Sequence, residues 1–77
     1  MIIESQNKEF FIDNPNNIHY APLNRDKISG EYIVISDTYS GSLFLGEYKD
    51  RDRASEVYEE IKKLTINRNK YYLMPKE

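Results

Sequence analysis

One apolar stripe in the second half of the chain constrains its fold most strongly. Apolar residues recur there at spacings of three, four and three, with charged residues between them, which predicts a helix with one buried face. Asp50 precedes the stripe and suits an N-cap, whereas residues 65–67 form helix poorly and indicate its end. The stripe consists of Ala54, Val57, Ile61 and Leu64.

Short runs of β-forming residues occupy most of the remaining chain. Residues 31–36 carry apolar side chains at successive positions, so we expect a central strand covered on both faces. Pro22 lacks a backbone N–H, so its strand should lie at an edge or end there. Gly46 predicts a bulge or a close backbone approach. The expected strands are residues 1–5, 9–13, 18–23, 31–36, 43–48 and 71–74.

This order of elements predicts a single α+β domain over residues 1–77. We expect a small antiparallel β-meander of about five strands, one α-helix packed on a face, and a C-terminal strand. The helix stripe would pack on Ile33 or Val34 and on Leu43 or Leu45. A chain of 77 residues without cysteine buries little surface and has no disulfide, so we also expect a homo-oligomer.

Composition narrows the classes of partner and site. The net charge is -2, with acids and bases interspersed, which disfavours nucleic acid as a partner. No run reaches the roughly 20 apolar residues of a membrane span, and the first residues do not resemble a signal peptide. We therefore expect a cytoplasmic protein without a membrane partner. The absence of cysteine and the single His19 disfavour a metal site within one chain.

The sequence contains no nucleophile–base pair, metal cluster or phosphate-binding loop, so we expect neither catalysis nor a cofactor. His19 has no partner at a recognisable spacing, which favours a structural or exposed histidine. Residues 50–53 begin the helix, where free N–H groups could bind an anion. The alternative is a helix start that is simply solvated.

Tyrosine is the unusual residue, with seven in 77 positions. A tyrosine has a rigid apolar ring and a polar tip, which suits a binding surface as well as the wet edge of a core. Stacked tyrosines with nearby arginines would form a pocket for a small nucleotide-like ligand. The alternative is that the tyrosines fill a half-buried sheet. The candidate ligand-binding residues are Arg51, Arg53, Arg25, Tyr39, Tyr48 and Tyr72.

Four segments of the chain carry a resemblance: residues 1–8 (MIIESQNK), 45–49 (LGEYK), 53–57 (RASEV) and 72–77 (YLMPKE). Together they resemble a group of small phage and prophage proteins of Gram-positive bacteria. The resemblance implies a phage origin, a bacterial host cytoplasm and this architecture, but it transfers no functional residue. Such an origin favours an anti-defence protein that sequesters a nucleotide-derived immune signal without catalysis. The alternative is an inhibitor that binds a host defence protein through an edge strand or an acidic surface.

Overall fold

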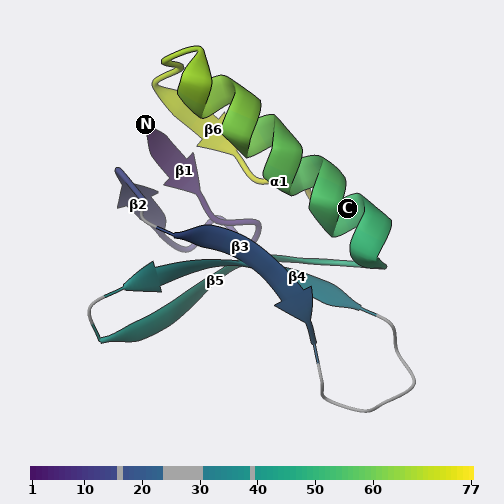
Figure 1. Cartoon of the computed structure of the whole chain (residues 1–77). Coiled ribbons are helices and arrows are strands. Elements are labelled where there is room, and N and C mark those ends of the chain that lie inside the picture. The colour runs from purple at the N-terminus through teal and green to yellow at the C-terminus, as the bar shows by residue number, and fades with distance from the viewer. Residues whose placement is uncertain (16, 24–30, 39) are drawn as a thin grey trace.

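The computed structural model describes residues 1–15, 17–23, 31–38 and 40–77. This part of the chain forms six strands and one helix (Figure 1). The predicted α+β class, with one helix and a C-terminal strand, is confirmed. The elements are β1 (Ile2–Glu4), β2 (Phe11–Asp13), β3 (Ile18–Pro22), β4 (Tyr32–Thr38), β5 (Gly41–Tyr48), α1 (Arg51–Ile66) and β6 (Tyr71–Leu73).

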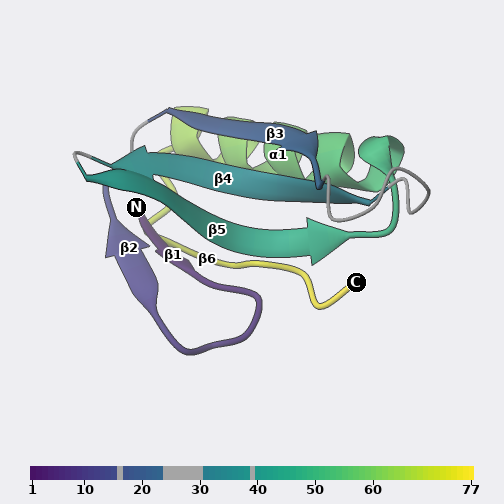
Figure 2. The same ribbon diagram turned by 90° about the horizontal axis from the view of Figure 1, so that it is seen from below.

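The strands are divided between two three-stranded sheets, where the sequence suggested one meander. One sheet has the order β3-β4-β5 and is antiparallel throughout. The other has the order β2-β1-β6, in which β1 pairs with β2 antiparallel and with β6 parallel. Figure 2 shows β1 and β6 beside β5. The backbone N–H of Gln6 bridges the sheets by donating to the Leu45 carbonyl over 2.8 Å.

The helix and both sheets share one hydrophobic core. Ala54 and Val57 are fully buried and Ile61 is 2% exposed, so the predicted helix stripe faces the core, with Leu64 partly buried at its end. Of the partners expected on the sheet, Val34 and Leu45 belong to the core cluster. The cluster contains Ile3, Val34, Leu45, Tyr48, Ala54, Val57, Ile61, Tyr72 and Met74.

The strand β4 lies at the centre of its sheet, as predicted, and β3 with Pro22 lies at the edge. Ile33 and Ile35 point away from Val34, yet they are only 4% and 7% exposed. Both faces of β4 are therefore buried within a single chain. Its apolar residues do not by themselves require a second copy, and the homo-oligomer stays a prediction.

The bulge predicted from Gly46 is confirmed at the neighbouring residue. Val34 pairs with Gly46 and Ile35 with Phe44, so Leu45 is the extra residue in β5. The bulge turns Leu45 into the core, where it is 1% exposed. A Cβ atom on Gly46 would lie only 2.7 Å from the Tyr48 hydroxyl oxygen, so the glycine makes room for that ring.

No helix in the described residues is long and apolar enough to cross a membrane.

Candidate functional site

The start of α1 directs its two arginines to different sides. Asp50 is the N-cap, as predicted, and its Oδ1 accepts from the Arg53 backbone N–H over 2.8 Å. Arg51 and Arg53 are two residues apart, which turns their side chains roughly 200° from each other around the helix. The Arg51 guanidinium lies 6.0 Å from the centre of the Tyr20 ring, and that of Arg53 lies 5.9 Å from Tyr48. The predicted site is therefore split in two.

The Arg51 side of the helix is an aromatic cluster. The Tyr20 ring centre lies 5.4 Å from that of Tyr58 and 6.3 Å from that of Tyr32, both in tilted or edge-on contact. Such spacings are typical of favourable aromatic pairs. Tyr20 and Tyr32 pack on the hydrophobic core between sheet and helix. Tyr20 and Tyr32 of the sheet and Tyr58 of the helix therefore contact one another where β3 and β4 meet α1.

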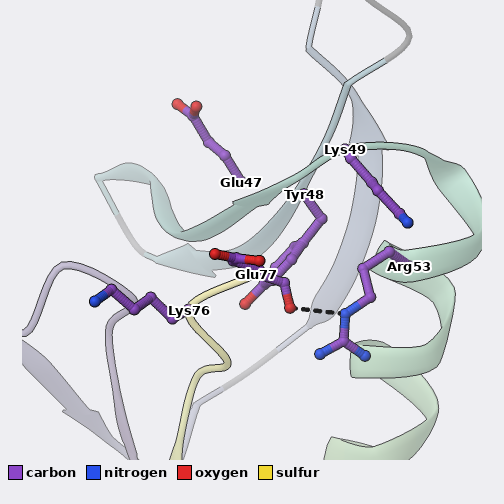
Figure 3. Close-up of a pocket in the computed structure, with 6 residues that line it drawn as sticks. All are labelled: Glu47, Tyr48, Lys49, Arg53, Lys76 and Glu77. Atoms are coloured by element: carbon purple, nitrogen blue, oxygen red, sulfur yellow. Dashed lines mark hydrogen bonds between the residues drawn. The ribbon is translucent and has the colours of Figure 1, made fainter.

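The Arg53 side is a pocket with a volume of about 450 Å³. The Arg53 Nε donates to the Glu77 carbonyl oxygen over 2.9 Å. No described residue accepts a hydrogen bond from the two terminal amino groups of Arg53. Figure 3 shows Lys49 on the same side as Arg53, whereas Glu47 and Lys76 extend away. The lining residues are Glu47, Tyr48, Lys49, Arg53, Lys76 and Glu77.

Tyr48 forms the buried wall of this pocket. It is 3% exposed, and its hydroxyl donates to the Pro75 carbonyl over 2.9 Å. Burial raises the pKa of Tyr48 to about 12, and the positive charge of Arg53 partly opposes the increase. The phenol is therefore protonated at neutral pH. Little of the ring is open, so the charged groups of the lining dominate the pocket: the cations of Lys49, Arg53 and Lys76 and the carboxylates of Glu47 and Glu77.

Tyr72 lies in the core and does not line the pocket. It is 6% exposed, and its hydroxyl lies near the Glu60 carboxylate without forming a hydrogen bond of ordinary geometry with any described residue. Burial raises its pKa, and the nearby Glu60 carboxylate adds to the increase. The sequence could not separate Tyr72 from its neighbour Tyr71, which is 54% exposed, because both are tyrosines in one short strand.

Removing each of the two buried hydroxyls should have different effects on stability. Tyr48→Phe deletes a hydrogen bond to Pro75 and should lower the free energy of unfolding by about 1 kcal/mol. Tyr72→Phe deletes a hydroxyl that forms no ordinary hydrogen bond with a described residue and should be neutral or stabilising. Urea denaturation of both variants and the parent measures the difference. Equal losses for the two variants would contradict this account of Tyr72.

Gln6 connects three of the segments that carry the resemblance. Its Nε2 donates to the carbonyls of Glu47 and Lys76, each over 2.9 Å, and to that of Pro75 over 3.2 Å. Its Oε1 accepts from the Glu47 N–H over 2.8 Å. The side-chain amide thus pairs with Glu47 as a peptide group of a neighbouring strand would. No local pattern in the sequence signals this role.

His19 and Asp37 form a contact that the sequence did not reveal. The histidine Nδ1 lies 3.8 Å from a carboxylate oxygen of Asp37 and 3.2 Å from the Asn17 carbonyl. Both side chains are nearly half exposed, at 46% and 42%. A pair this open to solvent contributes little to stability, in keeping with an exposed histidine.

Two predicted ligand residues, Arg25 and Tyr39, lie outside the described residues. Within the described ranges, no group of three or more His, Cys, Asp or Glu residues is arranged to hold a metal ion. Comparison with protein-family models, curated proteins and solved structures gives no match to this chain.

Proposed function

We propose that this protein binds a small anionic, nucleotide-like ligand in the Arg53 pocket and holds it without chemical change. The observation that carries the proposal is the state of Arg53. Its Nε is anchored on Glu77, whereas its two terminal amino groups have no acceptor among the described residues. A guanidinium presents such paired donors to two oxygens of one phosphate. Lys49 supplies a second positive charge at the same pocket.

Binding of this kind would allow the protein to evade a bacterial defence system. The resemblance to small phage proteins supports a function in the host cytoplasm, where a nucleotide-derived immune signal would be sequestered. Sequestration requires affinity and no reaction, so it needs no nucleophile, base or cofactor. The alternative, inhibition of a host defence protein, would use a different part of the molecule.

Calorimetry tests the proposal by measuring the binding of a panel of cyclic dinucleotides and ADP-ribose derivatives. Arg53→Ala should lower the affinity about 10- to 100-fold, because a charge-assisted hydrogen bond to phosphate is lost. Arg51→Ala is the matched control. Its guanidinium packs beside Tyr20 and does not line the pocket, so it should bind like the parent.

The state of the ligand after binding distinguishes sequestration from catalysis. The ligand should be recovered unchanged when the complex is denatured. A converted product would contradict the expected absence of catalysis. If no ligand in the panel releases or absorbs heat, or if Arg51→Ala weakens binding more than Arg53→Ala, the pocket is not the site.

We also propose that the protein is a homo-oligomer in solution, as its length and lack of disulfides led us to expect. Sedimentation at micromolar concentrations should show a species heavier than one chain. A single species with the mass of one chain throughout that range would refute the oligomer. It would leave the Arg53 pocket intact, because all its lining residues come from one chain.

A further inference from the structure

A second cavity lies between the turn that joins β1 to β2 and the segment that follows β6. We call it the Lys8 cavity. Its volume is about 460 Å³, within the roughly 300–1,000 Å³ of small-molecule sites. It adjoins the Arg53 pocket, because Lys76 lines both, and Figure 3 shows the Lys76 side chain extending away from Arg53. The lining of the Lys8 cavity includes Asn7, Lys8, Leu73, Pro75 and Lys76.

The charged side chains of this lining are both positive. They are Lys8 and Lys76, and neither forms an ion pair with a described residue. The acids nearest to the lining in sequence or in strand register are Glu4, Glu9 and Glu77, and none of them lines the cavity. Two cations at one concave surface, without an acid to neutralise them, attract an anion.

Asn7 adds a hydrogen-bond donor to the same lining. Its Oδ1 accepts from the Glu9 backbone N–H over 3.0 Å and from the Ser5 hydroxyl over 2.7 Å. Because a backbone N–H can only donate, the bond from Glu9 identifies the amide oxygen and therefore also the amide nitrogen. That nitrogen has no acceptor among the described residues. The oxygen of an anion in the cavity would supply one.

The backbone at Lys8 does not call for a lysine. Its φ of 62° lies in the left-handed region, which glycine adopts more easily than any residue with a Cβ atom. The Lys8 N–H donates to the Ser5 carbonyl over 3.0 Å, a bond that glycine would keep. Replacing Lys8 by glycine therefore removes the cation without straining the turn.

We propose that the Lys8 cavity binds a small phosphate monoester whose organic part is apolar. Lys8, Lys76 and the Asn7 amide nitrogen would contact the phosphate. A monoester carries a charge of about −1.5 to −2 at pH 7, which matches two lysines better than a singly charged diester or carboxylate does. The organic part would lie against Pro75 and against Leu73, which is 41% exposed. Binding here does not require a ligand in the Arg53 pocket.

Titration of the full chain with three probes, followed by amide NMR shifts, tests the proposal. Phenyl phosphate has both parts of the expected ligand, inorganic phosphate lacks the apolar part, and phenol lacks the charge. Phenyl phosphate should shift the amides of residues 6–8, 73, 74 and 76. It should bind at least about threefold more tightly than inorganic phosphate and at least about tenfold more tightly than phenol.

Protein variants then locate the contact. Asn7→Asp and Lys8→Gly should each weaken binding of phenyl phosphate at least about fivefold. Both should be as stable as the parent, because aspartate keeps the acceptor of Asn7 and glycine suits the φ of Lys8. Lys62→Gln is the matched control, since it removes an exposed lysine of α1 outside the cavity. Arg53→Ala should leave the shifts of residues 6–8 unchanged, which separates this cavity from the Arg53 pocket.

Three results would overturn the proposal. The first is that phenol binds as tightly as phenyl phosphate, or that phenyl phosphate shifts only amides around Arg53. The second is equal weakening by Lys8→Gly and Lys62→Gln, which would show that only the overall charge matters. The third is binding like that of the parent in both Asn7→Asp and Lys8→Gly. If Lys8→Gly does not fold, Lys8→Gln takes its place.

Discussion

Replacing Ile61 by aspartate is expected to unfold the domain. Ile61 is 2% exposed and belongs to the core cluster shared by the helix and both sheets. A carboxylate at this position would be buried without a partner, at a cost of several kcal/mol. A domain of 77 residues has a total stability of about 4–12 kcal/mol. Far-UV circular dichroism and thermal melting measure the loss.

A neighbouring substitution serves as the control for this experiment. Lys62→Asp introduces the same residue one position later, where the side chain is exposed, and should change the stability by less than about 1 kcal/mol. Val57→Asp should behave like Ile61→Asp, because Val57 is fully buried. If both core variants melt at the temperature of the parent, the stripe does not hold α1 on the sheets.

The features that the sequence predicted depend on neighbouring residues. The helix stripe follows from side chains three and four residues apart, and the Asp50 cap from the geometry of one turn. The edge position of Pro22 follows from its missing N–H. The bulge of β5 against β4 lies beside the glycine that signals it. Each of these could be predicted because the physical cause lies within a few residues of its effect.

The features that the sequence missed depend on residues far apart. The pairing of β1 with β6 joins the two ends of the chain in parallel, and no turn motif between them encodes it. The inward position of Tyr72 is likewise set by its register with Ile3. By contrast, the separation of Arg51 from Arg53 follows from helix geometry alone, so it could have been predicted from the sequence.

Gln6→Glu should be strongly destabilising although it hardly changes the shape of the side chain. The Gln6 amide nitrogen donates to carbonyls of Glu47, Pro75 and Lys76, which belong to β5 and to the segment after β6. A carboxylate has no proton to donate and would repel these oxygens. We expect the free energy of unfolding to fall by about 2 kcal/mol. Each hydrogen bond contributes about 0.5–1.5 kcal/mol, and the three bonds share the two protons of a nitrogen that is partly open to water, so their sum lies at the low end. Urea denaturation at neutral pH measures it.

Asn7→Asp is a matched control, because it makes the same chemical change at the next residue. Asn7 uses its oxygen, which accepts from the Ser5 hydroxyl over 2.7 Å and from the Glu9 N–H over 3.0 Å. Aspartate keeps that acceptor, so the variant should unfold like the parent. Equal losses from Gln6→Glu and Asn7→Asp would show that added charge, and not the lost donor, is responsible.

Acid should partly restore the Gln6→Glu variant. The facing carbonyls disfavour the ionised form, so the introduced carboxyl should have a pKa in the folded protein above the ordinary value of about 4.3. Its protonated form can donate one hydrogen bond. The protonated carboxyl stabilises the fold fully at a pH below the pKa that it has in the unfolded chain. This stabilisation is lost as the pH rises through the higher pKa that the carboxyl has in the folded protein. Relative to Asn7→Asp at each pH, the variant should therefore gain stability on acidification, and a constant difference would contradict the role of Gln6 as a donor.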